Sequence, residues 1–402
     1  MTTTTKQPLS GLRVIDMTTN LAGPFCGQML GDFGADVIKL ESPLSNGDMT
    51  RGIGPMQQPS VSWHFAHVNR NKRSVSLDIA QPEGREVFLK LLADTDVLIE
   101  NTKTGSLEKW GVGYEQCLKE KFPSLIHCAI SGFGRTGPYA KFPGYDAIGQ
   151  AYGGLMSLNG DPDGDPVRCA YYIADASTGL HATIGVLMAL QERNHSGLGQ
   201  FVDLSLVDCT QVLQQQYVSH WLGGGDACIP TRVGNRYPAV APADVFATQD
   251  GYINITILKD HQFVKLCSAL ECPELAEDSR YTTPQSRVEN YQALTEQLRP
   301  MFQQQQAEPL AERLLSQGVP AAPVLTVPEA MQHKQAIARG MLIEKDGIKA
   351  QGSPIKLSRT PATISRLAPR FGEDNRAVLS SLGLTEKEIE ALEKNRVITE
   401  GN

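Results

Sequence analysis

The sequence has few of the features that would place it at once in a common class. Aromatic residues make up only 6% of its 402 residues, and it shows neither an internal repeat nor a low-complexity tract. No long uncharged apolar run is present, so we expect no transmembrane helix. The first residues, MTTTTKQPLS, lack the apolar core of a signal peptide, and we therefore expect a cytoplasmic protein.

Metal and disulfide signatures are also missing. The eight cysteines are scattered with no C-x-x-C pair, which favours buried free thiols over disulfides or a zinc site. His64 and His67 form an H-x-x-H pair without a nearby acidic or cysteine partner, so we expect packing and no metal. The formal net charge of −7 argues against general nucleic-acid binding, although a local basic patch could still receive a phosphorylated ligand.

The first half of the chain alternates strand-like and helix-like segments. Strands are predicted at 12–17, 35–41, 96–100 and 125–130, with helices at 23–33 and 82–93 between them. Such alternation predicts an α/β fold with a parallel sheet, in which ligands bind beyond the carboxyl ends of the strands.

A chain of this length exceeds the size at which one core stops growing, so we expect two domains. A helix is predicted from 175 to 193, and the glycine run 223–225 begins a linker. A hairpin at 246–257 followed by helices indicates a smaller α+β domain. The predicted boundaries are 1–225 for the large domain, 226–323 for the small domain, and 324–402 for a linker and a return to the large domain.

Gly132, Gly134 and Gly137 match the G-x-G-x-x-G pattern of dinucleotide-binding proteins and follow a predicted strand. That pattern must also open a helix whose N-terminus holds the pyrophosphate. Here Pro138 and Pro143 flank the next residues, so we expect a glycine loop and no nicotinamide site.

Basic residues occur near several predicted strand ends. Arg51 follows the second strand, Lys103 and Lys109 follow the third, and Arg73 belongs to a cluster with Arg70 and Lys72. Together they could bind the phosphates of a nucleotide-like ligand. The alternative for the cluster is a solvated entrance to a strand.

Asp175 lies in the segment IADASTG at the start of a predicted helix. An aspartate there is typical of an N-cap, whose carboxylate accepts first-turn amide hydrogen bonds. The helix dipole would also keep that carboxylate ionised, which is the form needed for nucleophilic attack. The two roles are compatible.

These segments together resemble the class III CoA-transferase family, typified by formyl-CoA transferase and the carnitine CoA-transferases. The matching stretches, in family order, are LSGLRVIDMTTNLAGPFCGQMLGDFGADVIKLE, GDMTRG, NRNKRSVSLD, DVLIEN, SGFGRTGP, PGYDAIGQAYGG, IADASTGLHATIGVLMALQERNHSGLGQFVDLSLVD and, more weakly, GNRYPAVAP. The tail segments GSPIKLS and LGLTEKEIEAL are also similar to the family. The matches cover most of the first half of the chain.

The resemblance implies a nucleotide-fold-like large domain plus a smaller domain, in a homodimer of interlocked rings. It implies that Asp175 is the catalytic residue and that Tyr145 and Asp146 lie near the acyl group. It implies coenzyme A contacts at Asn20, Leu21, Ala22, Leu77, Asp78, Ala80, Asn101, Thr102, Lys103 and Lys109, to which the basic-residue argument adds Arg51 and Arg73. Departures from the formyl-CoA transferase pattern at Leu21, Ser42 and Lys109, and the missing tetraglycine loop near Gly234, speak against formate and oxalate as substrates.

The implied reaction moves coenzyme A from a donor acyl-CoA to a carboxylic acid through an aspartyl anhydride and an aspartyl-CoA thioester. The oxyanions would bind backbone amides at the start of the Asp175 helix or in the glycine loop. An α-methylacyl-CoA racemase is the closest alternative, but Tyr145 stands where racemases carry a histidine base. A non-catalytic sensor of CoA or a nucleotide is the other.

The acids exchanged are harder to predict. Arg232, Asn235 and Arg236 cluster after the linker, and guanidinium groups bind carboxylates through two hydrogen bonds. They favour a dicarboxylate acceptor with a succinyl-CoA-type donor, with a solvated loop as the alternative. If these arginines do not act, Arg168 or Arg51 could set specificity.

Overall fold

The computed structural model describes residues 6–345 and 348–400, which form two compact units. The first unit comprises Met1–Met156, Arg168–Ile229 and Met341–Asn402, and the second comprises Ser157–Val167 and Pro230–Gly340. Both boundaries of the second unit therefore differ from the predicted range 226–323. The loop 157–167 joins it because Arg232 donates hydrogen bonds to the carbonyls of Asp161 and Gly164.

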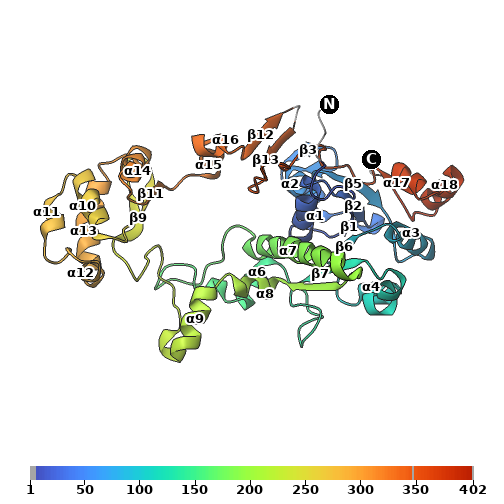
Figure 1. Cartoon of the computed structure of the whole chain (residues 1–402), viewed down its shortest axis with the longest axis horizontal. Coiled ribbons are helices and arrows are strands. Elements are labelled where there is room, and N and C mark those ends of the chain that lie inside the picture. Colours follow the sequence, from blue (N-terminus) through green and yellow to red (C-terminus); the bar gives the residue numbers. More distant parts are fainter. Residues whose placement is uncertain (1–5, 346–347, 401–402) are drawn as a thin grey trace. The chain divides into compact units, whose positions relative to one another are not determined.

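Six parallel strands form the sheet of the first unit (Figure 1). Their order is β5 (Lys72–Ser76), β2 (Asp36–Glu41), β1 (Arg13–Met17), β6 (Val97–Glu100), β7 (Ile126–Ser131) and β8 (Phe201–Ser205). The predicted strands lie within one residue of the observed ones, and the α/β fold with a large parallel sheet is confirmed.

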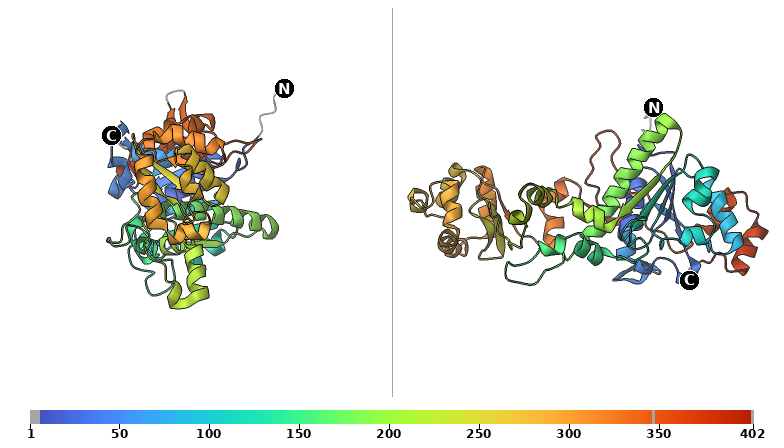
Figure 2. Two further views of the ribbon diagram at one scale, coloured as in Figure 1. Left: turned by 90° about the vertical axis from the view of Figure 1, so that its left-hand side faces the viewer. Right: turned by 90° about the horizontal axis from the view of Figure 1, so that it is seen from below.

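Both faces of this sheet are buried, because successive side chains of a strand point to opposite sides. Val14 and Val37 belong to the core under α1 (Ala22–Asp32) and α7 (Ile173–Ser196). Their neighbours Ile15 and Ile38 belong to the core on the other face, under α3 (Pro82–Leu92), α17 (Asn375–Ser381) and α18 (Glu386–Lys394). The right-hand view of Figure 2 shows this layering, with α7 in green on one side of the sheet.

The remaining elements of the first unit are short. The helices are α2 (Trp63–Asn69), α4 (Ser106–Lys109), a π-helical turn (Tyr114–Leu118), α5 (Lys119–Lys121), α6 (Asp146–Tyr152), α8 (Leu206–Val212) and α9 (Gln215–Gly224), with 3-10 turns at Pro43–Ser45, Met49–Gly52 and Gly225–Cys228. Two hairpins pair β3 (Met56–Gln58) with β4 (Val61–Ser62) and β12 (Leu342–Lys345) with β13 (Ile348–Gln351).

The second unit has its own core around an antiparallel sheet in the order β11-β10-β9. Its strands are β9 (Ala243–Ala247), β10 (Tyr252–Thr256) and β11 (Ala321–Pro323). Its helices are α10 (Asp260–Ala269), α11 (Glu274–Glu277), α12 (Pro284–Glu289), α13 (Tyr291–Phe302), α14 (Ala307–Ser316), α15 (Val327–Gln332) and α16 (Lys334–Ala338), and the turn Leu155–Ser157 lies at the border of the units. The second unit is therefore an α+β domain, as predicted.

The 24-residue helix α7 is long and apolar enough to cross a membrane by length and composition alone. In the structure 56% of its most apolar stretch is buried, against α1, α8 and strands β7 and β8. Burial in the core accounts for the apolar residues on this side of the helix.

Candidate active site

The loops that follow β1, β6 and β7 meet at the carboxyl edge of the sheet. The side chain of Asn101, after β6, accepts a hydrogen bond from the Thr19 amide (2.9 Å) and donates one to the Thr19 carbonyl (2.8 Å). This reciprocal pair links the β1 and β6 loops. The predicted contacts Asn20, Asn101 and Lys103 are thereby brought to one edge.

A buried ion pair shapes the loop that contains Asn20. Lys39, fully buried within β2, donates to the Thr18 carbonyl (2.7 Å) and to Oδ2 of Asp48 (3.2 Å). The other carboxylate oxygen of Asp48, Oδ1, accepts a hydrogen bond from the amide of Asn20 (3.3 Å). These contacts hold Asn20 at a φ of 67°, a left-handed conformation that asparagine tolerates better than most residues.

The glycine loop after β7 touches the segment that leads to Tyr145. A Cβ atom on Gly132 would lie 2.6 Å from the Cα of Gly144, and the same distance holds in reverse. No side chain fits at this crossing. Among residues 132–144 no helix follows the loop, so the G-x-G-x-x-G match lacks the helix that a dinucleotide site requires, as predicted.

The helix that carries Asp175 is capped by a different aspartate. Oδ1 of Asp146, at the start of α6, accepts hydrogen bonds from the amides of Ala174 (2.8 Å) and Asp175 (3.3 Å). Its Oδ2 accepts one from Gln150 (2.7 Å). The prediction that Asp175 is itself the N-cap is therefore wrong, because the helix begins at Ile173 and Asp146 already occupies its first amides.

The carboxylate of Asp175 is free to react. Within residues 6–345 and 348–400 no hydrogen bond to its side-chain oxygens is found. Burial, together with the nearby Asp146 carboxylate, raises the pKa of Asp175 to about 7. Burial and the Asp146 charge thus outweigh the expected stabilisation of the ionised carboxylate by the helix. A carboxylate of raised pKa is a stronger nucleophile when it is ionised.

Two cavities adjoin Asp175, and Asn20 and Tyr145 also line both. The larger cavity, of about 320 Å³, is lined by Thr19, Asn20, Ala22, Asn101, Thr102, Lys103, Thr104, Ile130, Ser131, Gly132, Lys141, Phe142, Pro143, Gly144, Tyr145, Asp175 and Leu206. The smaller cavity, of about 260 Å³, is lined by Asn20, Leu21, Thr50, Ile53, His64, Tyr145, Asp146, Ala147, Arg168, Tyr172 and Asp175. The Asp175 side chain can therefore be approached from two sides.

Two of the predicted phosphate-binding residues serve the fold instead. Arg51 is 4% exposed and makes two hydrogen bonds with Glu41 (2.8 and 2.6 Å), with its guanidinium over the Phe65 ring. Arg73 pairs with Asp36 (2.6 Å) at the amino edge of the sheet, because it lies inside β5 and not after a strand. The predictions for Arg51 and Arg73 are corrected accordingly.

The other predicted contacts lie outside both cavity linings. Leu77, Asp78 and Ala80 follow the edge strand β5, and Lys109 is the exposed last residue of α4.

The predicted acceptor-binding residues Arg232, Asn235 and Arg236 belong to the second unit. There Arg232 binds the 157–167 loop, and Arg236 stacks on Tyr291 with its guanidinium carbon 4.1 Å from the ring centre.

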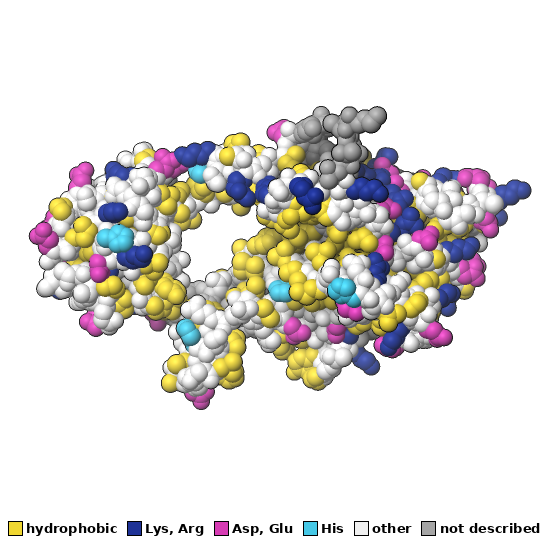
Figure 3. Space-filling model, in the orientation of Figure 1, with side chains coloured by type: hydrophobic (Ala, Val, Ile, Leu, Met, Phe, Trp, Pro, Cys, Tyr) yellow, Lys and Arg dark blue, Asp and Glu magenta, His cyan; other side chains and the backbone are white. Residues whose placement is uncertain are grey.

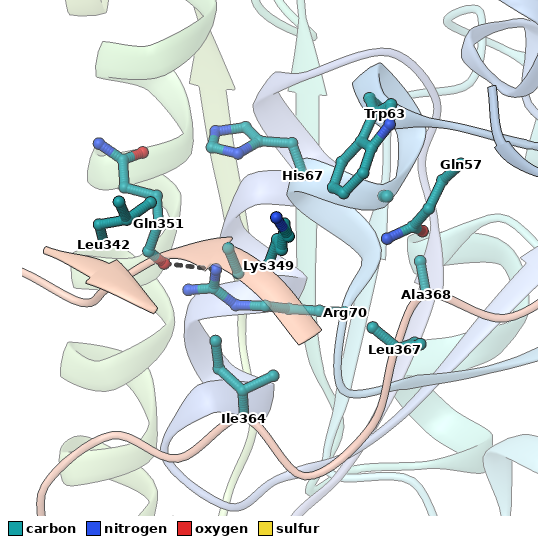
Figure 4. Close-up of a pocket in the computed structure, with 12 residues that line it drawn as sticks. Gln57, Trp63, His67, Arg70, Leu342, Lys349, Gln351, Ile364, Leu367 and Ala368 are labelled. Carbon is teal, nitrogen blue, oxygen red and sulfur yellow. Dashed lines mark hydrogen bonds between the residues drawn. The ribbon is translucent and has the colours of Figure 1, made fainter. Parts of the chain in front are cut away.

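A further cavity of about 270 Å³ lies between α2 and the β12–β13 hairpin (Figure 4). Its Arg70 is already bound to Asp32 (2.6 Å) and to the Gln351 carbonyl (2.6 Å), the contact drawn in Figure 4. In the part of the chain that the structure describes, no group of three or more His, Cys, Asp or Glu side chains could hold a metal ion.

The family model for CoA-transferase family III matches residues 9–375. The chain belongs to this family. It is 38% identical to the succinate–glutarate CoA-transferase of Agrobacterium fabrum (95% of this chain, 97% of that one). It is 36% identical to the succinyl-CoA–D-citramalate CoA-transferase of Chloroflexus aurantiacus (98% of each chain). A crystal structure of a CAIB/BAIF family protein from Brucella suis superposes with a TM-score of 0.87 at 40% identity, covering 94% of this chain and 100% of that one.

As a family III CoA-transferase, the chain is an enzyme that moves CoA between acyl groups, and the sensor alternative is set aside. Its site also contains residues that sequence reasoning missed: Lys141 in the larger cavity, and His64 and Tyr172 in the smaller one. Lys141 lies in the proline-flanked segment after the glycine loop. That position was the one feature of the sequence that could have marked Lys141 as a site residue.

Proposed function

We propose that the enzyme transfers CoA from a succinyl-CoA-type donor to a dicarboxylic acid, through covalent intermediates on Asp175. The observation that carries the proposal is the position of Asp175 on both cavities, with a carboxylate to which the described residues make no hydrogen bond. The two relatives described above are named for succinate or succinyl-CoA and a second diacid, which supports this substrate class.

The reaction consists of four acyl exchanges. An Asp175 oxygen attacks the thioester carbonyl of the donor, the C–S bond breaks, and CoA leaves as a thiolate. The thiolate attacks the γ-carbonyl of Asp175, so the donor acid leaves as a carboxylate and an aspartyl-CoA thioester remains. The acceptor carboxylate displaces CoA from Asp175, and the thiolate then attacks the acceptor carbonyl to regenerate the aspartate. No proton or electron is gained or lost overall, and one hard displacement becomes several easier ones.

The oxyanions need hydrogen-bond donors. The amides of Ala174 and Asp175, at the start of the helix, already donate to Asp146, which argues against the first of the two predicted donor sets. The glycine segment 132–144, of which Gly132 and Gly144 line the larger cavity, is the set that we favour.

The interlocked homodimer predicted from the resemblance remains part of this proposal. Along α7 the side chains of Leu180, Ile184, Leu187 and Met188 are 42–67% exposed, which forms an apolar stripe. Helix α9 has no buried residue, yet it carries the exposed Val218, Trp221 and Leu222. Figure 3 shows hydrophobic side chains on α9, the helix that projects downwards in this view. A second copy that covers these surfaces would account for them.

Trapping of the covalent intermediate tests the proposal. The wild type, incubated with succinyl-CoA and then with hydroxylamine or borohydride, is expected to carry a modification on the peptide that contains Asp175. Asp175→Asn should abolish both the adduct and turnover, whereas Asp208→Asn, at an exposed position on α8, should retain them. An adduct on another residue, or turnover by Asp175→Asn, would contradict the assignment.

A further inference from the structure

We propose that Arg168 binds the distal carboxylate of the acid in the smaller cavity and so selects dicarboxylates. This inference rests on the proposed function. It places acid recognition on a residue in the same unit as the nucleophile. Arg232 and Arg236, which the sequence favoured for this role, lie in the second unit with their side chains engaged there.

Arg168 is the only Lys or Arg among the residues that line the smaller cavity. Its two acidic neighbours in that lining are Asp146 and Asp175. Both oxygens of Asp146 are already occupied by the helix amides and by Gln150, and Asp175 is needed for the chemistry. No carboxylate of the described residues forms an ion pair with Arg168. The guanidinium is therefore available to a carboxylate that comes from outside.

The position of Arg168 is fixed although its side chain is exposed. Its Nη1 donates to the carbonyls of Cys169 and Ala170, both at 3.2 Å, which leaves Nε and Nη2 for a ligand. The amide of Cys169 in turn donates to Gln150 (2.8 Å), and the Gln150 side chain is fully buried.

Gln150 also connects this loop to the catalytic helix. Its Nε2 donates to Oδ2 of Asp146 (2.7 Å), and Oδ1 of the same carboxylate caps the helix at Asp175. A continuous series of contacts thus holds the arginine in register with the nucleophile. A diacid must attack with one carboxylate while its other carboxylate is bound. It therefore requires a guanidinium, with its pair of N–H donors, at a set distance from the reacting carbonyl.

The size and chemistry of the cavity fit a short diacid. Its volume of about 260 Å³ suits an acid of a few carbons and not a long acyl chain. Ile53 and Leu21 provide apolar walls for the methylene groups, while the hydroxyl of Tyr172 and the imidazole of His64 are polar groups of the same lining. A monocarboxylate of equal length would leave the guanidinium without an anion.

The test compares succinate with butyrate, which has the same number of carbons but no distal carboxylate, in wild type, Arg168→Ala and Arg168→Lys. Acetyl-CoA is the donor in every assay, because a succinyl donor would place its own carboxylate on the same arginine and a butyryl donor would give no net reaction with butyrate. Arg168→Ala is expected to raise KM for succinate about tenfold to a hundredfold, while KM for acetyl-CoA and KM for butyrate stay within about twofold of wild type. Arg168→Lys should recover part of the loss, since it restores charge without the fork. If butyrate is not turned over, its inhibition constant against succinate replaces KM.

Arg232→Ala serves as the matched control and should affect the two acids equally. Equal losses with succinate and butyrate in Arg168→Ala, a raised KM for acetyl-CoA, or no change at all would each overturn the assignment. Mass spectrometry of the Asp175 adduct separates this failure from failure of the proposed function. If wild type forms the adduct and Arg168→Ala does not discriminate, only the role of Arg168 is lost. If wild type forms no adduct, the covalent mechanism itself is wrong.

Discussion

The amide nitrogen of Asp175 lies 3.3 Å from Oδ1 of Asp146, so one carboxylate caps the helix that carries the other. The arrangement leaves the Asp175 side chain out of the capping role. It also places a second negative charge beside it, which adds to burial in raising the pKa of Asp175 to about 7.

Asp146→Asn separates the capping of the helix from the effect of the charge. The asparagine side-chain oxygen can still accept hydrogen bonds from the helix amides, but the negative charge is gone. Loss of a like charge lowers the pKa of Asp175, so the acid limb of the pH profile of kcat/KM should move to lower pH. Asp146→Ala removes the cap as well and should lower the free energy of unfolding by about 0.5–2 kcal/mol. An unchanged pH profile in Asp146→Asn would show that Asp146 acts only as a cap.

The wild-type pH dependence follows from the same pKa. In the proposed mechanism Asp175 attacks as a carboxylate, so activity should fall as the pH drops below about 7, approaching tenfold per pH unit. Initial rates at saturating and at low acyl-CoA, measured from pH 5 to pH 9, test this expectation. An activity that stays flat down to pH 5 would mean that the nucleophile has an ordinary carboxylate pKa during turnover.

Lys103 and Lys141 line the larger cavity, and we expect them to attract the phosphates of CoA. Each Lys→Ala variant should raise KM for acyl-CoA about two- to fivefold at low salt, with a smaller effect at high salt, because exposed charges are screened. Arg73→Ala is the matched control, since Arg73 pairs with Asp36 at the opposite edge of the sheet. A larger effect for Arg73 than for Lys103 would restore the original basic-cluster hypothesis.

Arg51 is expected to matter for stability. Its guanidinium is buried with Glu41, and removal of one partner leaves the other charge buried and unpaired. Arg51→Ala should therefore lower the free energy of unfolding by about 3–5 kcal/mol, as measured by urea denaturation. Arg135→Ala, which removes the partly buried partner of Glu100, offers a comparison at another ion pair of the sheet edge. A fully stable Arg51→Ala protein with a raised KM for acyl-CoA would assign the residue to CoA after all.

The apolar stripe of α7 leads to a prediction about assembly. Threaded rings cannot separate without opening, so the proposed interlocked dimer should persist in sedimentation at nanomolar protein. Ile184→Asp combined with Met188→Asp should yield monomers or insoluble protein, because it puts charges into the proposed interface. Leu315→Asp, an equally exposed position on α14 of the second unit, should leave the sedimentation unchanged. A monomeric, active wild type at nanomolar concentration would contradict the dimer.

The sequence was most informative about regular elements. Four strands, β1, β2, β6 and β7, were predictable because each is an apolar run bounded by turn residues. Parallel strands that are buried on both faces have that pattern. The sequence from 207 to 221 has a continuous helical pattern, yet it forms two helices, because α8 ends at Val212 and α9 begins at Gln215. Nothing in the local pattern marks that break.

Asp175, the proposed nucleophile, lines both cavities of the site, but the surroundings of this residue were predictable only in part. Arg51, Lys72 and Arg73 looked like ligand-binding cations because sequence alone does not show their carboxylate partners, which are distant in the chain. Lys72, for example, is 56 positions from Asp16 and is fully buried with it. Asp146 was expected near the acyl group, but its capping contact depends on how α6 meets α7, which only the tertiary structure shows.

The crossing of Gly132 and Gly144 limits how this enzyme could be redesigned. Neither position admits even a methyl group without displacing the other chain segment, so this part of the larger cavity cannot be reshaped by side chains at these two positions. A broader acid repertoire must come from the smaller cavity, where Leu21 and Ile53 present side chains that can be shortened or branched. Directed-evolution libraries should vary those two positions and leave the glycines untouched.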